Sequence, residues 1–439
     1  MKQTDERYQQ YIKVLKEELV AAMGCTEPVS IAYAAARARE LRAQVKRAEE
    51  AIELLGAEPR HVLIEASGNI IKNVKSVTVP HTGGMKGIEA AAAAGIAAGD
   101  ASRGLQVIAS IAESSLPQIK AYLERTDIQV RRLESADVLD LIVRVRHGEE
   151  EAAVRISGAH DHIVWEMKNG DVLLRREKPR QEEAPLIDRS FMSVEGILDF
   201  ADSVDLDEVS DVLQRQIRCN MAIANEGLKQ GYGANIGRVL LDMRGDDLHT
   251  RVRAYAAAGS DARMSGCGLP VIINSGSGNQ GITASVPLVV WGRAHQAGRE
   301  LLYRSLIVSN LITIHLKNGI GKLSAYCGVI SAGCGAACGI CYQDGGDLEA
   351  VSHTLVNALA VNSGVVCDGA KPSCAAKIAS AIEAGLLGYE MYRHGSQFRG
   401  GEGIVSKGVE NTIRNISRLA REGMQQTDRE IIEIMTGCC

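Results

Sequence analysis

Aromatic side chains are scarce in this chain of 439 residues. They make up 4% of the sequence, with only three phenylalanines and two tryptophans. The chain holds 45 glycines, together with alanine-rich runs such as residues 90–94. Because glycine lets one backbone approach another closely, we expect helices that pack through small residues rather than around large rings.

An excess of positive charge and long apolar runs are also absent. The net charge is -5, which gives no basic footprint for a nucleic-acid binder. Apolar runs such as residues 284–291 are far shorter than a bilayer span, and the polar residues 1–7 are not followed by the apolar stretch of a secretory signal. We expect a cytoplasmic protein with a small-molecule substrate and no nucleic-acid or membrane partner. Whether it forms a homo-oligomer stays open.

Eleven cysteines are present in a chain that shows no export signal. In a reducing compartment cysteines remain thiols, bind metal or carry out chemistry, instead of forming disulfides. A chain of this length also needs no disulfides for its stability. The cysteines are therefore the first place to look for a functional site.

Length and pattern predict two domains. Residues 1–185 are expected to form an α+β domain with N-terminal helices and a mainly antiparallel sheet, and residues 186–439 an all-helical domain. The charged residues 176–184 are the predicted linker. Asn169-Gly170 is typical of a hairpin turn. The β-branched segments predicted as strands are 61–65, 74–79, 105–111, 128–130, 141–145, 153–156, 163–165 and 172–174.

Three cysteines in the predicted helical domain carry the most information. Cys327 lies in a glycine-rich run, and Cys367 and Cys374 flank the loop Cys-Asp-Gly-Ala-Lys-Pro-Ser-Cys. Three thiolates can hold an iron–sulfur cube and leave one iron open as a Lewis acid, which suggests a lyase. Spacing alone also permits zinc. Cys334 and Cys338 lie on the helix expected after Cys327, and we interpret them as small buried side chains.

Two loops are candidates for substrate binding. Residues 270–283 pass from a short apolar run through a Gly/Ser/Asn loop into a helix, an arrangement that presents backbone N–H groups to a carboxylate or phosphate. An ordinary glycine-rich connection is an equally good interpretation of this loop. Residues 80–87 run from a predicted strand into a helix and include three glycines. The side chains offered by the two loops are Ser275, Ser277, Asn279, His81 and Lys86.

Five separated segments carry a resemblance to a known family. Over essentially its whole length the chain resembles the iron–sulfur L-cysteine desulfidases, which are related to the iron–sulfur L-serine dehydratases of the alpha-chain type. The carriers, in chain order, are Gly-Cys-Thr-Glu-Pro at 24–28, the loop at 80–87, the loop at 274–283, Tyr-Cys-Gly at 326–328 and the loop at 367–374.

The resemblance implies a [4Fe-4S] cluster ligated by Cys327, Cys367 and Cys374. It also implies that Cys25 acts near the substrate. A thiol just before a helix start at Thr26 is suited to ionise and to take the Cα proton as a general base. The loops at His81 and at 275–280 resemble the family's substrate loops. Serine dehydratases also have a cysteine tail that reaches the cluster, and this chain ends in two cysteines, 438 and 439.

We therefore predict a carbon–sulfur lyase that converts L-cysteine into sulfide, ammonia and pyruvate. One alternative keeps the cluster and changes the leaving group, giving a dehydratase of L-serine or another β-substituted amino acid. An alternative of another class is a non-catalytic iron–sulfur redox sensor, and a third is a metabolite-binding protein with structural zinc. The sensor interpretation leaves Cys25 and the two loops unexplained.

Overall fold

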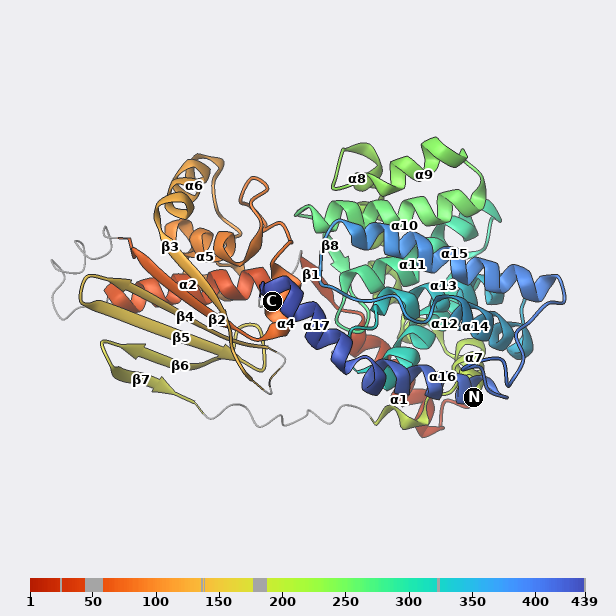
Figure 1. Ribbon diagram of the computed structural model, residues 1–439. Coiled ribbons are helices and arrows are strands. Elements are labelled where there is room, and N and C mark those ends of the chain that lie inside the picture. The colour runs from red at the N-terminus through yellow and green to blue at the C-terminus, as the bar shows by residue number, and fades with distance from the viewer. Residues whose placement is uncertain are drawn as a thin grey trace. The chain divides into compact units, whose positions relative to one another are not determined.

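The computed structural model describes residues 1–23, 26–43, 58–135, 137, 139–176, 188–321 and 324–437. The chain forms two compact units, coloured along the sequence in Figure 1. The helical unit consists of Met1–Gly24, Leu186–Cys367 and Pro372–Arg429, and the sheet unit of Cys25–Pro185, Asp368–Lys371 and Glu430–Cys439. The predicted linker lies, after Arg176, outside the described residues.

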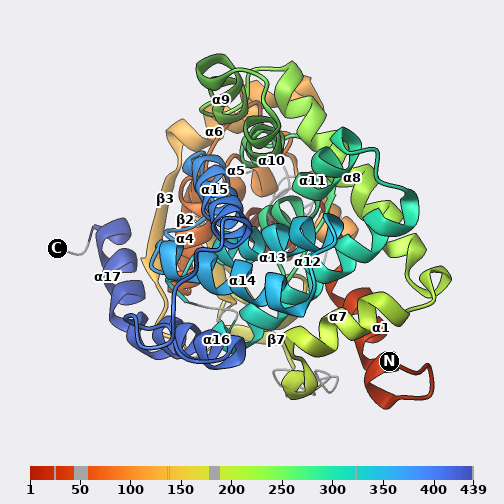
Figure 2. The ribbon, with the colours of Figure 1, turned by 90° about the vertical axis from the view of Figure 1, so that its right-hand side faces the viewer.

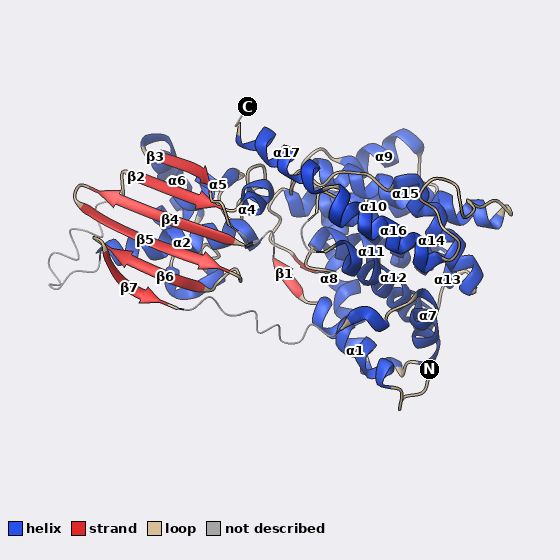
Figure 3. Ribbon diagram, turned by 60° about the horizontal axis from the view of Figure 1, so that its bottom comes forward, coloured by secondary structure: helices blue, strands red, loops and turns tan. Residues whose placement is uncertain are grey.

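The sheet unit is built on six strands in the order β3-β2-β4-β5-β6-β7. Only β2 and β3 pair in parallel, and the other four pairings are antiparallel, so the predicted mainly antiparallel sheet is confirmed. Figure 3 shows the strands side by side. Their bounds are β2 His61–Ala66, β3 Asp127–Arg132, β4 Asp140–His147, β5 Glu150–Ser157, β6 Ile163–Lys168 and β7 Asp171–Arg175.

One face of this sheet is covered by helices. Helix α2 packs on β4 and β5, and α5 packs on α2 and β3. Along β2 the buried residues Val62, Ile64 and Ala66 alternate with more exposed ones, as expected for a strand with one covered face. The helices of this unit are α2 Thr26–Ala43, α4 Gly68–Val74, α5 Gly87–Ala98 and α6 Leu116–Arg125.

The hairpin prediction is confirmed, and two strand predictions are wrong. Asn169 and Gly170 both adopt positive φ between β6 and β7, as a tight hairpin turn requires. Residues 74–79 instead begin at the last residue of α4 and continue as a turn, and 105–111 form the end of a 3-10 helix and turns. The β-branched residues there, including Val77 and Val107, are buried in the core. Burial accounts for the composition of both segments, neither of which forms a strand, although Thr78 makes an isolated antiparallel bridge with Lys86.

The helical unit is helical as predicted, apart from one short strand pair. Strand β1 (Ala21–Met23) pairs antiparallel with β8 (Pro270–Ile272). In Figure 2 helix α13 runs through the middle of the unit, in contact with α11, α12, α14 and α15. The helices are α1 Glu6–Glu18, α7 Val194–Ser203, α8 Ser210–Lys229, α9 Ile236–Arg244, α10 Leu248–Met264, α11 Gly278–Ala294, α12 Arg299–Ile320, α13 Gly328–Gln343, α14 Leu348–Asn362, α15 Ser373–Arg393 and α16 Val409–Arg418. The last helix, α17 Gln425–Thr436, belongs to this unit only as far as Arg429.

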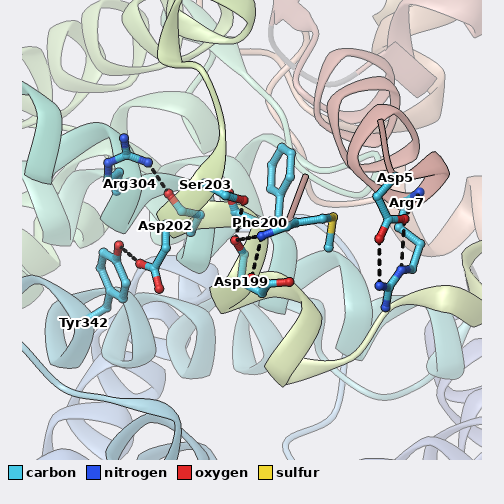
Figure 4. Close-up of polar contacts among 10 residues, drawn as sticks. Asp5, Arg7, Asp199, Phe200, Asp202, Ser203, Arg304 and Tyr342 are labelled. Atoms are coloured by element: carbon cyan, nitrogen blue, oxygen red, sulfur yellow. Dashed lines mark hydrogen bonds and ion pairs between the residues drawn. The ribbon is translucent and has the colours of Figure 1, made fainter. Parts of the chain in front are cut away.

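Side chains of α12 and α13 form hydrogen bonds with the C-terminal end of α7. The Arg304 guanidinium of α12 donates to the carbonyls of Ala201 and Val204. The Tyr342 hydroxyl of α13 donates to Asp202 Oδ1 at 2.5 Å (Figure 4). The last carbonyls of a helix have no partner within the helix. These bonds therefore satisfy the end of α7 and fix the C-terminal end of α13.

Among the described helices, none combines the length and apolarity that a membrane crossing requires.

Candidate active site

A short backbone pairing brings two distant cysteines together within the helical unit. Tyr326 and Val366 form an antiparallel bridge. On either side of it, the Cys327 N–H donates to Val365 O at 2.9 Å and the Cys367 N–H donates to Ala325 O at 2.5 Å. Cys327 and Cys367 are thereby fixed on two adjacent segments although 40 residues separate them in the sequence.

Two of the three predicted ligands, Cys327 and Cys374, lie where helices begin. Cys327 is the N-cap residue of α13 and is 6% exposed, and its sulfur accepts the Val329 N–H. Cys374 lies in the first turn of α15, and both Cys367 and Cys374 are partly exposed. Free N–H groups and the positive end of the helix dipole favour negative charge in such places. The starts of α13 and α15 therefore stabilise the negative charge of thiolates, or of an anionic group bound to them.

The thiols influence each other's ionisation. The pKa of Cys327 is raised well above its ordinary value, first by its hydrogen bond with Cys367, then by burial and by the charges of Cys367 and Cys374. Three thiolates so close together in a buried place need a cationic partner. The donor set therefore fits a thiolate-bound metal group.

The set does not fit a single metal ion. Within the described chain, no three His, Cys, Asp or Glu side chains converge closely enough to hold one ion. The corners of a multi-iron cluster are spread more widely than the ligands of one zinc ion, so a cluster remains compatible with these three cysteines.

The other cysteines of α13 are structural, as the sequence indicated. Cys334, Cys338 and Cys341 are at most 2% exposed. Burial raises the pKa of Cys334 to about 12 and that of Cys341 to about 11, and it also raises the pKa of Cys338. Such thiols stay neutral and pack as small apolar side chains.

The loop after β8 makes a tight turn at the start of α11. Asn274 and Ser277 exchange backbone hydrogen bonds at 3.1 and 3.0 Å, and Ser275 and Gly276 between them have positive φ. Ser277 caps α11 by accepting the Gln280 N–H. Ser277, one of the residues predicted to bind substrate, thus acts as the N-cap of α11. Asn279 is 6% exposed, and its Oδ1 accepts from Arg263 Nη1 at 3.3 Å.

A fully buried amide network holds this turn. Asn274 Nδ2 donates to Asn310 Oδ1 at 2.9 Å. Asn310 and Gln216 then exchange two hydrogen bonds at 2.9 and 2.8 Å. All three side chains have no exposed surface. Because amides in such a place are costly to leave unpaired, the network fixes the position of Asn274 and with it the strained Ser275.

The structure brings the turn and the cysteines together through a residue that the sequence interpretation missed. Gln280, in the first turn of α11, is 5% exposed and packs on the backbone of Gly328, which directly follows Cys327. A Cβ atom at Gly328 would lie 2.7 Å from Gln280 Cδ. A glutamine after Ser-Gly-Asn has no special signature, so only the tertiary contact identifies it.

The remaining predicted residues belong to the sheet unit. His81, with φ 58°, and Lys86 are exposed on a loop before α5. The loop is closed by the Val79 N–H bound to Met85 O at 2.9 Å, and the roles of both side chains in substrate binding remain predictions. Cys25 lies outside the described residues, as do the two cysteines of the C-terminal tail.

A family model and several related proteins each match this chain over most of its length. Residues 102–433 match the family described as "Serine dehydratase alpha chain". The chain is 54% identical over 439 residues to UPF0597 protein DSY1109 of Desulfitobacterium hafniense (strain Y51), covering 100% of this chain and 99% of the relative. It is 46% identical over 428 residues to a UPF0597 protein of Lachnoclostridium phytofermentans, covering 98% and 99%. A UPF0597 protein of Treponema denticola is 44% identical over 437 residues, with 98% of each chain covered.

Replacing Asn310 by alanine tests the amide network. The change removes the partners of Gln216 and Asn274 and leaves both amides buried, so the free energy of unfolding should fall by about 3 kcal/mol. Urea denaturation monitored by circular dichroism gives this value. Asn415→Ala, at an exposed amide that donates to Ile404 O, should cost less than about 1 kcal/mol. Equal losses in the two variants would show that the network does not stabilise the unit.

Proposed function

The chain belongs to the serine dehydratase alpha chain family, and we propose that it is a cytoplasmic lyase that eliminates sulfide from L-cysteine. The family is that of iron–sulfur-dependent dehydratases. The observation that supports the proposal most is the pairing of residues 325–327 with 365–367, which brings Cys327 and Cys367 together. Cys374 lies near enough to raise the pKa of Cys327. L-Cysteine would yield sulfide, ammonia and pyruvate.

In the proposal Cys327, Cys367 and Cys374 hold a [4Fe-4S] cluster. When bound, the cluster supplies an iron without a protein ligand, a Lewis acid that polarises the bond to the leaving sulfur. The protein contributes two helix starts, which favour the negative charge of the thiolates. It also contributes a buried setting in which charge interactions are strong. The turn at Ser275 and Ser277 offers polar groups beside this place for the substrate.

The proposed proton acceptor is Cys25. As a thiolate it would take the Cα proton of the amino acid, and the electron pair left on Cα would form a double bond to Cβ as the C–S bond breaks. Sulfide leaves with the bonding electrons. The remaining aminoacrylate gains water and releases ammonia to give pyruvate, which needs no further catalytic group.

Removal of any one proposed cluster ligand should abolish the cluster. Cys327→Ala, Cys367→Ala or Cys374→Ala should lose the brown iron–sulfur absorbance after anaerobic reconstitution, because two thiolates hold the cluster poorly. Cys334→Ala and Cys338→Ala should keep it, since both thiols are buried and neutral. A Cys367→Ala protein with full iron and sulfide content would sink the ligand assignment.

Replacement of Cys25 separates proton transfer from cluster binding. Cys25→Ala should keep the iron content and still bind L-cysteine, yet lose kcat by about 10²-fold or more, the usual scale for a positioned base. Cys219→Ala, on α8 and away from the three thiols in sequence, is the control and should keep full activity. Loss of the iron–sulfur absorbance in Cys25→Ala would make this residue a ligand instead of a base.

The leaving group should decide substrate choice. Sulfide can depart without prior protonation, whereas the hydroxyl of L-serine needs a proton from an acid. Glu27, the carboxyl closest to Cys25 in sequence, accepts a hydrogen bond from Asn73 Nδ2 at 3.2 Å and is engaged in the sheet unit. In direct competition kcat/KM should favour L-cysteine more than tenfold, roughly 1.4 kcal/mol of transition-state binding. Pyruvate release from L-serine at an equal rate would establish the dehydratase alternative, which the family description favours.

A further inference from the structure

The side-chain amide of Gln280 is buried and has no hydrogen-bond partner among the described residues. The residue is 5% exposed, and its Oε1 is inaccessible and unpaired. Only its backbone is engaged, with the N–H bound to Ser277 Oγ. Buried amides are almost always paired in folded proteins, so an unpaired one beside a candidate site points to a ligand.

The unpaired amide lies against the start of α13. A Cβ atom on Gly328 would be 2.7 Å from Gln280 Cδ and Nε2 and 2.9 Å from Oε1, so only glycine leaves room for the amide next to Cys327. One turn further along α13, the Ser331 hydroxyl is 1% exposed and also has no partner within the described chain. Residues three and four apart share a helix face. Two unpaired polar groups therefore lie at the start of α13, whose N-cap residue is Cys327.

Another buried glutamine gives a useful contrast. Gln343, at the opposite end of α13, is 7% exposed and its Oε1 is unpaired, but its Nε2 donates to Ser305 Oγ at 3.1 Å. Its amide is thus anchored by the protein. The Gln280 side chain has no such hydrogen bond within the described chain, although burial of its amide is just as unfavourable.

We propose that the Gln280 amide binds the α-ammonium and α-carboxylate groups of the amino-acid substrate. The amide carbonyl would accept from the ammonium group, and the amide N–H₂ would donate to the carboxylate. A cluster alone would not supply both hydrogen-bond partners of this amide. Its sulfide and thiolate sulfurs accept hydrogen bonds, so they could pair with the amide N–H₂ but would leave Oε1 unpaired. A zwitterionic amino acid carries both required partners on one carbon. The inference rests on the proposed function, in which an amino acid binds beside Cys327.

This arrangement predicts which ligands depend on Gln280. Recognition would be directed at the groups that all α-amino acids share, and not at the leaving group. A thiol that carries neither group, such as 2-mercaptoethanol, offers no donor to Oε1 and no carboxylate to the amide N–H₂. Its binding should depend little on the amide, whereas binding of L-cysteine should depend on it strongly.

The experiment compares Gln280→Met and Gln280→Glu with the wild type in the reconstituted full-length protein. Both variants should keep the iron content and absorbance, raise KM for L-cysteine at least tenfold and leave the inhibition constant of 2-mercaptoethanol within twofold. The glutamate variant keeps an acceptor and loses the donor, so it also tests the contact to the carboxylate. Gln343→Met is the matched control and should leave KM unchanged.

Three outcomes would overturn the inference. They are an unchanged KM in both Gln280 variants, loss of absorbance in both, which would assign the amide to the cluster, and an equal weakening of L-cysteine and 2-mercaptoethanol. The proposed function fails separately, through the wild type. If the wild type turns over L-serine and not L-cysteine, the same comparison is made with L-serine and ethylene glycol, and Gln280 should still discriminate between them.

Discussion

The antiparallel bridge between residues 325–327 and 365–367 is the constraint on which the candidate site depends. Two backbone hydrogen bonds flank it, and both involve the cysteines themselves. α13 begins immediately after Cys327, and α15 begins six residues after Cys367. A change that separates the two segments would thus displace two thiols and two helix starts together. The site is set by main-chain geometry, and the side chains around it are arranged on that frame.

The scarcity of aromatic residues agrees with close packing of helices, which is clearest at α13, the helix that begins after Cys327. α13 contains mostly Gly, Ala, Ser and Cys and is buried along nearly its whole length. A Cβ atom at Gly335 would lie 2.5 Å from Ser309 O of α12, so the two backbones are in close contact. Larger residues would force α13 away from its neighbours. Tight packing of this kind keeps the start of α13, and the Gln280 amide resting on it, in a fixed position.

Much of this arrangement could be predicted from the sequence, because the informative signals are local. The cysteine spacing, the glycine-rich turn before α11 and Asn169-Gly170 each have a short-range physical signature. The segments at 74–79 and 105–111 were mistaken for strands because β-branched composition reports burial as well as strand pairing. Gln280 and the Gln216–Asn310–Asn274 network have no local signature, since their partners lie 36 or more residues away. Only the tertiary structure identifies them.

Mössbauer spectroscopy of ⁵⁷Fe-reconstituted protein tests the central claim most directly, because it distinguishes the irons of a cluster by their ligands. Three cysteine ligands on a [4Fe-4S] cluster predict one iron that differs from the other three, and addition of L-cysteine under anaerobic conditions should change the signal of that iron alone. Four equivalent irons that do not respond to L-cysteine, or a single mononuclear iron, would contradict the account.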